Sequence, residues 1–157
     1  MPVVPVSTVR QQVAQRKPDP VYLILGDDEA EMSRLSTEIS GLVEDELRVF
    51  NSDRFYAGER GVTPAAIVEA ARTLPMMSDR RVVTVLRAEK LLKPKRRGKA
   101  AVEEAPDDGE TETPTDLDVL EAYVRDPSPQ TTLVMLASDV DRTRKVYKTL
   151  QKQSAIV

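Results

Sequence analysis

Uninterrupted apolar runs constrain the fold of this chain more than any other feature. Residues 21–25 read Val-Tyr-Leu-Ile-Leu and end at Gly26, and residues 81–86 read Arg-Val-Val-Thr-Val-Leu, again without strict alternation. A strand with one exposed face alternates apolar and polar residues, whereas a strand buried on both faces does not. The runs therefore predict central strands of a parallel α/β sheet.

Helical patterns separate these strands. One helix is expected to begin at Asp27 or Asp28, and another at Thr63-Pro64, a capping hydroxyl followed by Pro at the first helical position. Further helices are predicted at residues 7–17, from residue 115 or 116 and from residue 141 or 143, further strands at residues 47–50, 131–137 and 155–157, and a loop at residues 51–61. This alternation implies right-handed crossovers and a sheet covered on both faces. The length of 157 residues fits a single domain, residues 1–157.

Residues 94–114 break the pattern, because they are rich in charged residues, Gly and Pro and contain almost no large apolar side chain. We expect a disordered insertion within the domain. A basic run lies at its start: Lys93, Lys95, Arg96, Arg97 and Lys99. This run could contact phosphates, but it lacks interleaved aromatic residues and is followed by an acidic stretch, so a solvated linker is favoured over a nucleic-acid site.

The chain contains neither Cys nor His, which excludes several kinds of site. Without Cys there is no disulfide, thiolate metal site or Cys nucleophile. Without His, the commonest general base and metal ligand are missing and a Ser-His-Asp triad cannot form. The formal net charge of −3 argues against a dedicated duplex-DNA binder. No apolar run approaches the length of a membrane span, so we expect a soluble cytoplasmic protein.

The junction after residues 21–25 is where an α/β protein would carry a phosphate-binding loop. Such a loop needs several glycines, a Lys at the helix start and a Ser or Thr for magnesium. Here Gly26 alone is followed by Asp27, Asp28 and Glu29, whose carboxylates suit a helix start but repel phosphate. We therefore expect no nucleotide cofactor. The three acids could instead hold a divalent metal, but an acidic N-cap is the commoner role, and we expect no metal site.

The segment from Leu74 to Arg81 joins a predicted helix to a predicted strand, a place where the chain should be exposed. It nevertheless brings together three large apolar residues, Leu74, Met76 and Met77. Met side chains are flexible and polarizable, and they suit surfaces that fill an apolar groove on a partner. The alternative is that both Met side chains fold into the core of the domain, and the pattern alone leaves both interpretations open.

The order of these segments resembles the bacterial DNA polymerase III delta subunit. The resemblance is carried by residues 22–29 (YLILGDDE), 71–83 (ARTLPMMSDRRVV), 133–137 (LVMLA) and 144–150 (RKVYKTL), and it covers most of the chain apart from residues 94–114. It implies a RecA-like, AAA+-related α/β domain that has lost ATP binding. The small helical domain and the C-terminal collar domain of the family are missing, so the chain is expected to be the first domain alone.

The resemblance also implies a function. Delta subunits bind the sliding clamp and help the clamp loader to open it for loading on primed DNA, and they are not catalytic by themselves. In the family, two adjacent large apolar residues, often Leu and Phe, insert into a pocket on the clamp. Met76 and Met77 fall on these positions, with Leu74 close by, although two Met residues lack the rigid ring. The implied partners are the clamp and, through the missing domains, other loader subunits, with indirect or weak contact to DNA.

Two other functions remain open from the residues alone. One is a divergent P-loop-like nucleoside-triphosphatase that uses the acidic residues after Gly26. The other is a nucleic-acid-binding module that uses the basic run at residues 93–99.

Overall fold

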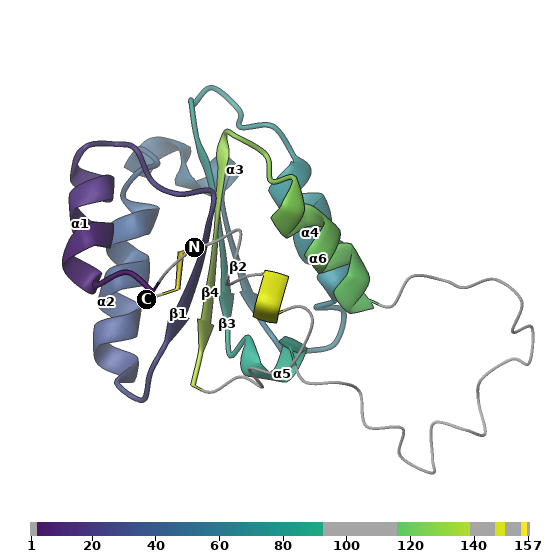
Figure 1. Ribbon diagram of the computed structural model, residues 1–157. Coiled ribbons are helices and arrows are strands. Elements are labelled where there is room, and N and C mark those ends of the chain that lie inside the picture. The colour runs from purple at the N-terminus through teal and green to yellow at the C-terminus, as the bar shows by residue number, and fades with distance from the viewer. Residues whose placement is uncertain (1–2, 93–115, 139–146, 150–154, 157) are drawn as a thin grey trace, which may run out of the picture.

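The computed structural model describes residues 3–92, 116–138, 147–149 and 155–156. Its elements, in chain order, are α1 (Val6–Ala14), β1 (Val21–Leu25), α2 (Glu29–Ser40), η1 (Asp45–Leu47), α3 (Arg48–Asn51), β2 (Ser52–Tyr56), α4 (Pro64–Arg72), β3 (Arg81–Leu86), α5 (Glu89–Leu92), α6 (Asp116–Arg125), β4 (Thr131–Ala137) and β5 (Ala155–Ile156). The strands form one sheet in the order β2-β3-β4-β1-β5, and every described pairing is parallel. Figure 1 shows α1 and α2 against one face and α4 and α6 against the other. The predicted parallel α/β sheet is thus confirmed.

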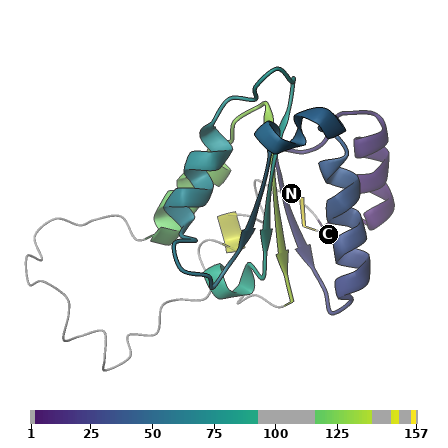
Figure 2. The ribbon, with the colours of Figure 1, turned by 180° about the vertical axis from the view of Figure 1, so that it is seen from behind.

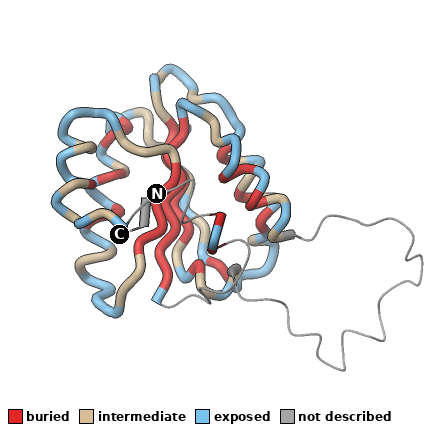
Figure 3. Tube along the Cα trace, viewed as in Figure 1, coloured by how far each residue is buried: buried red, intermediate tan, exposed pale blue. Residues whose placement is uncertain are grey.

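The central strands are buried on both faces, which explains their uninterrupted apolar sequences (Figure 3). Along β1, Val21 and Leu23 pack with α4 and α6, whereas Tyr22 and Ile24 pack with α1 and α2. Fully burying a side chain of this size stabilises the fold by roughly 1.5–3 kcal/mol. The two apolar layers therefore hold the sheet between its two pairs of helices.

The helix starts follow the local sequence. The Asp28 carboxylate accepts a hydrogen bond from Glu31 N at 3.0 Å at the start of α2, which decides between the two acids that were predicted to cap it. The Thr63 hydroxyl accepts one from Ala66 N at 3.1 Å, and Pro64 is the first residue of α4, as predicted. Each cap satisfies a backbone donor that has no partner within its helix.

The strand predicted at residues 47–50 is wrong, and the loop predicted at residues 51–61 is wrong for residues 51–56 but confirmed for residues 57–61. Residues 45–51 form η1 and α3, and β2 follows at Ser52–Tyr56. The apolar pair Val49 and Phe50, which suggested a strand, is 84% and 53% exposed. Among the described residues, β2 is an edge strand that pairs with β3 alone, so its sequence needs little apolar content. Phe55 is the β2 residue that packs against the described core.

The predicted insertion at residues 94–114 lies outside the described residues, as does the first part of the helix predicted from residue 141 or 143. Residues 147–149 are helical, and Tyr147 is buried in the layer that includes α4 and α6. Figure 2 shows α3 crossing over the end of β2 at the edge from which the strands begin. In the part of the chain described by the structure, no helix has the length and apolar character needed to cross a membrane.

Candidate interaction surface

An exposed apolar surface lies at the amino-terminal ends of β2 and β3. These ends are neighbours, because the two strands pair in parallel with Ser52 opposite Val82. The surface consists of large apolar side chains just before the two strands, with these exposed fractions: Val49 84%, Phe50 53%, Leu74 74%, Met76 55% and Met77 84%. We call these five residues the amino-edge surface. Large apolar side chains that are exposed together at one end of a sheet point to an interaction site, whereas single exposed apolar residues are ordinary.

The exposure of Met76 and Met77 rules out one of the two interpretations left open by the sequence. Both side chains point away from the core, so the alternative in which they fill the interior of the domain is wrong. Met77 has a φ of 58°, in the left-handed region that residues other than Gly rarely adopt. A residue held there costs roughly 1–3 kcal/mol, so the surrounding contacts must hold the segment in place.

Asn51 supplies those contacts. Its side chain is fully buried, and its Oδ1 accepts a hydrogen bond from Met76 N at 2.5 Å. Its Nδ2 donates to Met76 O at 2.7 Å and to Leu47 O at 3.2 Å. One amide therefore satisfies both backbone groups of Met76 and joins the segment to the start of α3. This pairing fixes the backbone of the segment while its apolar side chains stay in solvent.

Two arginines fix the elements on either side. The buried Arg81, the first residue of β3, donates from Nη1 to Phe50 O at 2.9 Å and forms an ion pair with Asp53 on β2. Arg72, the last residue of α4, lies with its guanidinium 4.6 Å from the ring centroid of Tyr123 on α6. The segment between α4 and β3 is therefore held at both ends as well as in the middle.

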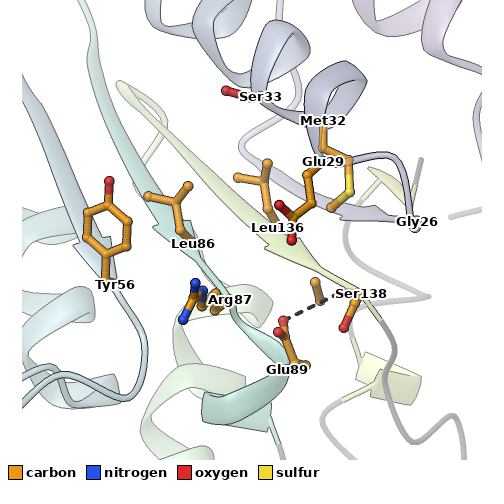
Figure 4. Close-up of a pocket in the computed structure, with 11 residues that line it drawn as sticks. Gly26, Glu29, Met32, Ser33, Tyr56, Leu86, Arg87, Glu89, Leu136 and Ser138 are labelled. Atoms are coloured by element: carbon orange, nitrogen blue, oxygen red, sulfur yellow. Dashed lines mark hydrogen bonds between the residues drawn. The ribbon is translucent and has the colours of Figure 1, made fainter.

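The junction at Gly26 lies at the opposite end of the sheet, where the strands have their carboxyl-terminal ends. A pocket of about 260 Å³ opens there between α2, β3, α5 and β4, with Glu29 on one side and Arg87 and Glu89 on the other (Figure 4). Glu89 Oε2 accepts a hydrogen bond from Ser138 N at 3.4 Å. The volume is slightly below the roughly 300–1,000 Å³ of most ligand pockets. Among the described residues that line the pocket, Glu29 and Glu89 outnumber the one cation, Arg87, and there is no Lys, so this lining does not suit a nucleotide.

The structure also bears on the metal site considered for the acids after Gly26. Asp28 uses its carboxylate to cap α2, and among the described residues there is no group of three or more acidic, His or Cys side chains that could hold a metal ion. The acidic N-cap is thus the role that the structure shows for Asp28.

Sequence reasoning found three of the five residues in the amino-edge surface and missed Val49 and Phe50, which it placed in a strand. It also missed Asn51, because no local signal joins this residue to Met76, which is 25 positions away. The one sequence feature that marks Asn51 is its place directly before a polar edge strand, and this is a weak signal.

The fold belongs to the RecA-like, AAA+-related class, as comparison with solved structures shows. The chain is similar to a DNA polymerase III gamma-subunit-related protein of Thermotoga maritima (TM-score 0.63, 13% identity, 97% of this chain and 44% of that chain covered). It is also similar to a variant of RuvB from the same organism (TM-score 0.50, 13% identity, 96% and 41% covered). The DNA clamp loader delta protein of Bacillus subtilis matches with a TM-score of 0.75 and 22% identity over 98% of this chain.

The family follows from the sequence match. The family model described as "DNA polymerase III, delta subunit" matches residues 22–157, so the chain belongs to the DNA polymerase III delta subunit family. This confirms the resemblance found in the sequence. The chain spans 42% of the length of the Bacillus subtilis delta protein. None of the curated proteins matches the chain.

Proposed function

We propose that this chain is the clamp-binding part of a delta-type clamp-loader subunit, which binds the sliding clamp and helps to open it for loading on primed DNA. The observation that carries the proposal is the exposed pair Met76 and Met77 on a backbone held by the buried Asn51. This pair occupies the positions at which the family resemblance expects clamp-binding residues. A backbone that is already ordered loses less entropy on docking, which favours binding.

In the proposed mechanism the amino-edge surface acts as a wedge. Met76 and Met77 enter an apolar groove on the clamp, where flexible thioether side chains can adapt to an irregular shape. α4 and the segment after it then strain one interface of the clamp ring. Other clamp-loader subunits, which bind ATP in the cytoplasm, control when the wedge is exposed, and contact with DNA is indirect or weak.

The subunit itself is proposed to be non-catalytic and to bind no nucleotide. The junction at Gly26 has a single glycine and acidic residues where a phosphate loop needs backbone donors and a Lys. The pocket beside this junction is lined by two acids, Glu29 and Glu89, against one cation, Arg87, and this net negative charge disfavours a phosphate. The nucleic-acid alternative depends on the basic run at residues 93–99, which lies outside the described residues, and the net charge of −3 does not favour it.

The test is a titration of the protein with the sliding clamp of the same organism, for the wild type and for the double variant Met76→Ala/Met77→Ala. The side chains are 55% and 84% exposed, so the free energy of unfolding should hardly change. The affinity should fall by about 2–4 kcal/mol, roughly thirty-fold to nearly a thousand-fold, if the pair anchors the interface.

The matched control is Tyr56→Ala. This side chain is 43% exposed but lies at the other end of β2, so its loss should leave clamp affinity unchanged. A stable double variant that binds the clamp as tightly as the wild type would refute the proposed site. A wild-type protein that does not bind the clamp would refute the proposed function.

A further inference from the structure

We infer that Val49 and Phe50 of α3 form a second arm of the clamp-binding surface, so that the partner is held by two chain segments. The inference rests on the proposed function and extends its site. Residues 48–51 form a single helical turn before β2, and the two apolar side chains of this turn face solvent.

The exposure of this turn is not a result of poor packing. The preceding Leu47 packs against the apolar layer beneath α2, and Asn51, directly after the pair, is fully buried. The turn is therefore anchored on both sides, and its geometry directs Val49 and Phe50 outward. Phe50 is 53% exposed, so it forgoes about half of the roughly 1.5–3 kcal/mol that full burial of such a side chain contributes. A partner that covers the ring would recover this stabilisation.

Direct contacts join the turn to the Met pair. Asn51 makes two hydrogen bonds with the backbone of Met76, at 2.5 and 2.7 Å. Arg81, which begins the strand after the Met segment, donates to Phe50 O at 2.9 Å. The backbones of Phe50 and Met76 are thus held relative to each other through two side chains. Both segments lie at the end of the sheet where β2 and β3 begin, which is at the top of Figure 1.

Two of the cations near this surface form ion pairs within the domain. Arg48 forms an ion pair with Asp45 at 2.7 Å, and Arg81 is paired with Asp53. Arg80, in the segment that carries Met76 and Met77, donates instead to the Thr132 hydroxyl at 3.3 Å. Because Asn51 and Arg81 join the two segments directly, the occupant is inferred to be the clamp groove that receives Met76 and Met77. Phe50 adds a rigid ring beside two flexible side chains, and aromatic residues are enriched among the anchors of interfaces.

The experiment measures clamp affinity and thermal stability for Phe50→Ala, Val49→Asp and the control Tyr56→Ala. Phe50→Ala should weaken clamp binding about ten- to thirty-fold, the range of a strong interface residue. Val49→Asp, at a side chain that is 84% exposed, should fold normally and also weaken binding, because docking would bury its charge. Tyr56→Ala should bind like the wild type.

The outcomes separate this inference from the proposed function. If Met76→Ala/Met77→Ala loses binding but Phe50→Ala and Val49→Asp bind like the wild type, the second arm is refuted and the proposed function stands. If the wild type does not bind the clamp, both are refuted. If sedimentation shows a self-associated wild type that Phe50→Ala dissociates, with clamp affinity unchanged, the surface joins two copies of this chain and the inference is also refuted.

Discussion

Replacing Asn51 with Ala is expected to release the segment that carries Met76 and Met77. The side-chain amide makes three hydrogen bonds, with Met76 N at 2.5 Å, Met76 O at 2.7 Å and Leu47 O at 3.2 Å. Each such bond contributes a net stabilisation of about 0.5–1.5 kcal/mol. The N–H and C=O groups of Met76 can form hydrogen bonds with water once the segment opens. The loss in free energy of unfolding should therefore be smaller than the sum of the three bonds at their upper values, at about 2–3 kcal/mol.

The same change should reduce clamp affinity, although Asn51 is buried and cannot contact a partner. A free segment must be ordered again on binding, at a cost of roughly 1–2 kcal/mol for each residue that is fixed. We therefore expect a loss of about ten-fold or more in affinity, since 1.4 kcal/mol corresponds to a factor of ten. Asn51→Asp provides a comparison, because it keeps an acceptor for Met76 N but turns an oxygen toward the carbonyls of Met76 and Leu47. It should be at least as destabilising as Asn51→Ala.

Urea denaturation measures the free energy of unfolding, and titration with the clamp measures the affinity at a temperature where both variants are folded. The reasoning would be refuted by an Asn51→Ala variant whose free energy of unfolding and clamp affinity both match those of the wild type. The buried amide would then not hold the segment, and another contact would have to account for the left-handed backbone at Met77.

Two further predictions concern proton and nucleotide binding. Burial raises the pKa of Tyr22 to about 12, whereas an unfolded Tyr titrates near 10. The native state thus keeps a proton that the unfolded state releases, so stability present below about pH 10 should decline by about 2–3 kcal/mol as the pH rises toward 12. Urea denaturation should show less of this decline in Tyr22→Phe, and an equal decline in both proteins would contradict the assignment. Addition of Mg-ATP at about 1 mM should not raise the melting temperature, because only a ligand of the native state does so, and a saturable increase would show that the Gly26 junction binds nucleotide.

Much of the architecture could be predicted from the sequence, because the signals are local. A strand buried on both faces must be apolar at every position, and residues 21–25 and 131–137 meet this requirement in the structure. The caps Asp28 and Thr63 each bond to a backbone group three residues away, so the starts of these two helices could also be predicted from the sequence. A phosphate loop is a short continuous motif, so its replacement by acidic residues after Gly26 could also be recognised from the sequence.

The tertiary structure decided the features that depend on residues distant in sequence. An edge strand pairs on one side only, so β2 carries few apolar residues and could not be distinguished from a loop. The apolar residues Val49, Phe50, Met76 and Met77 are compatible either with a core or with an interface. Hydrophobicity can be read from the sequence, but the side of the backbone that faces solvent cannot. In the structure, the buried amide of Asn51 pairs with the backbone of Met76, 25 residues away. Such a contact exists only after the parallel sheet has brought the amino-terminal ends of β2 and β3 together, and no local pattern encodes it.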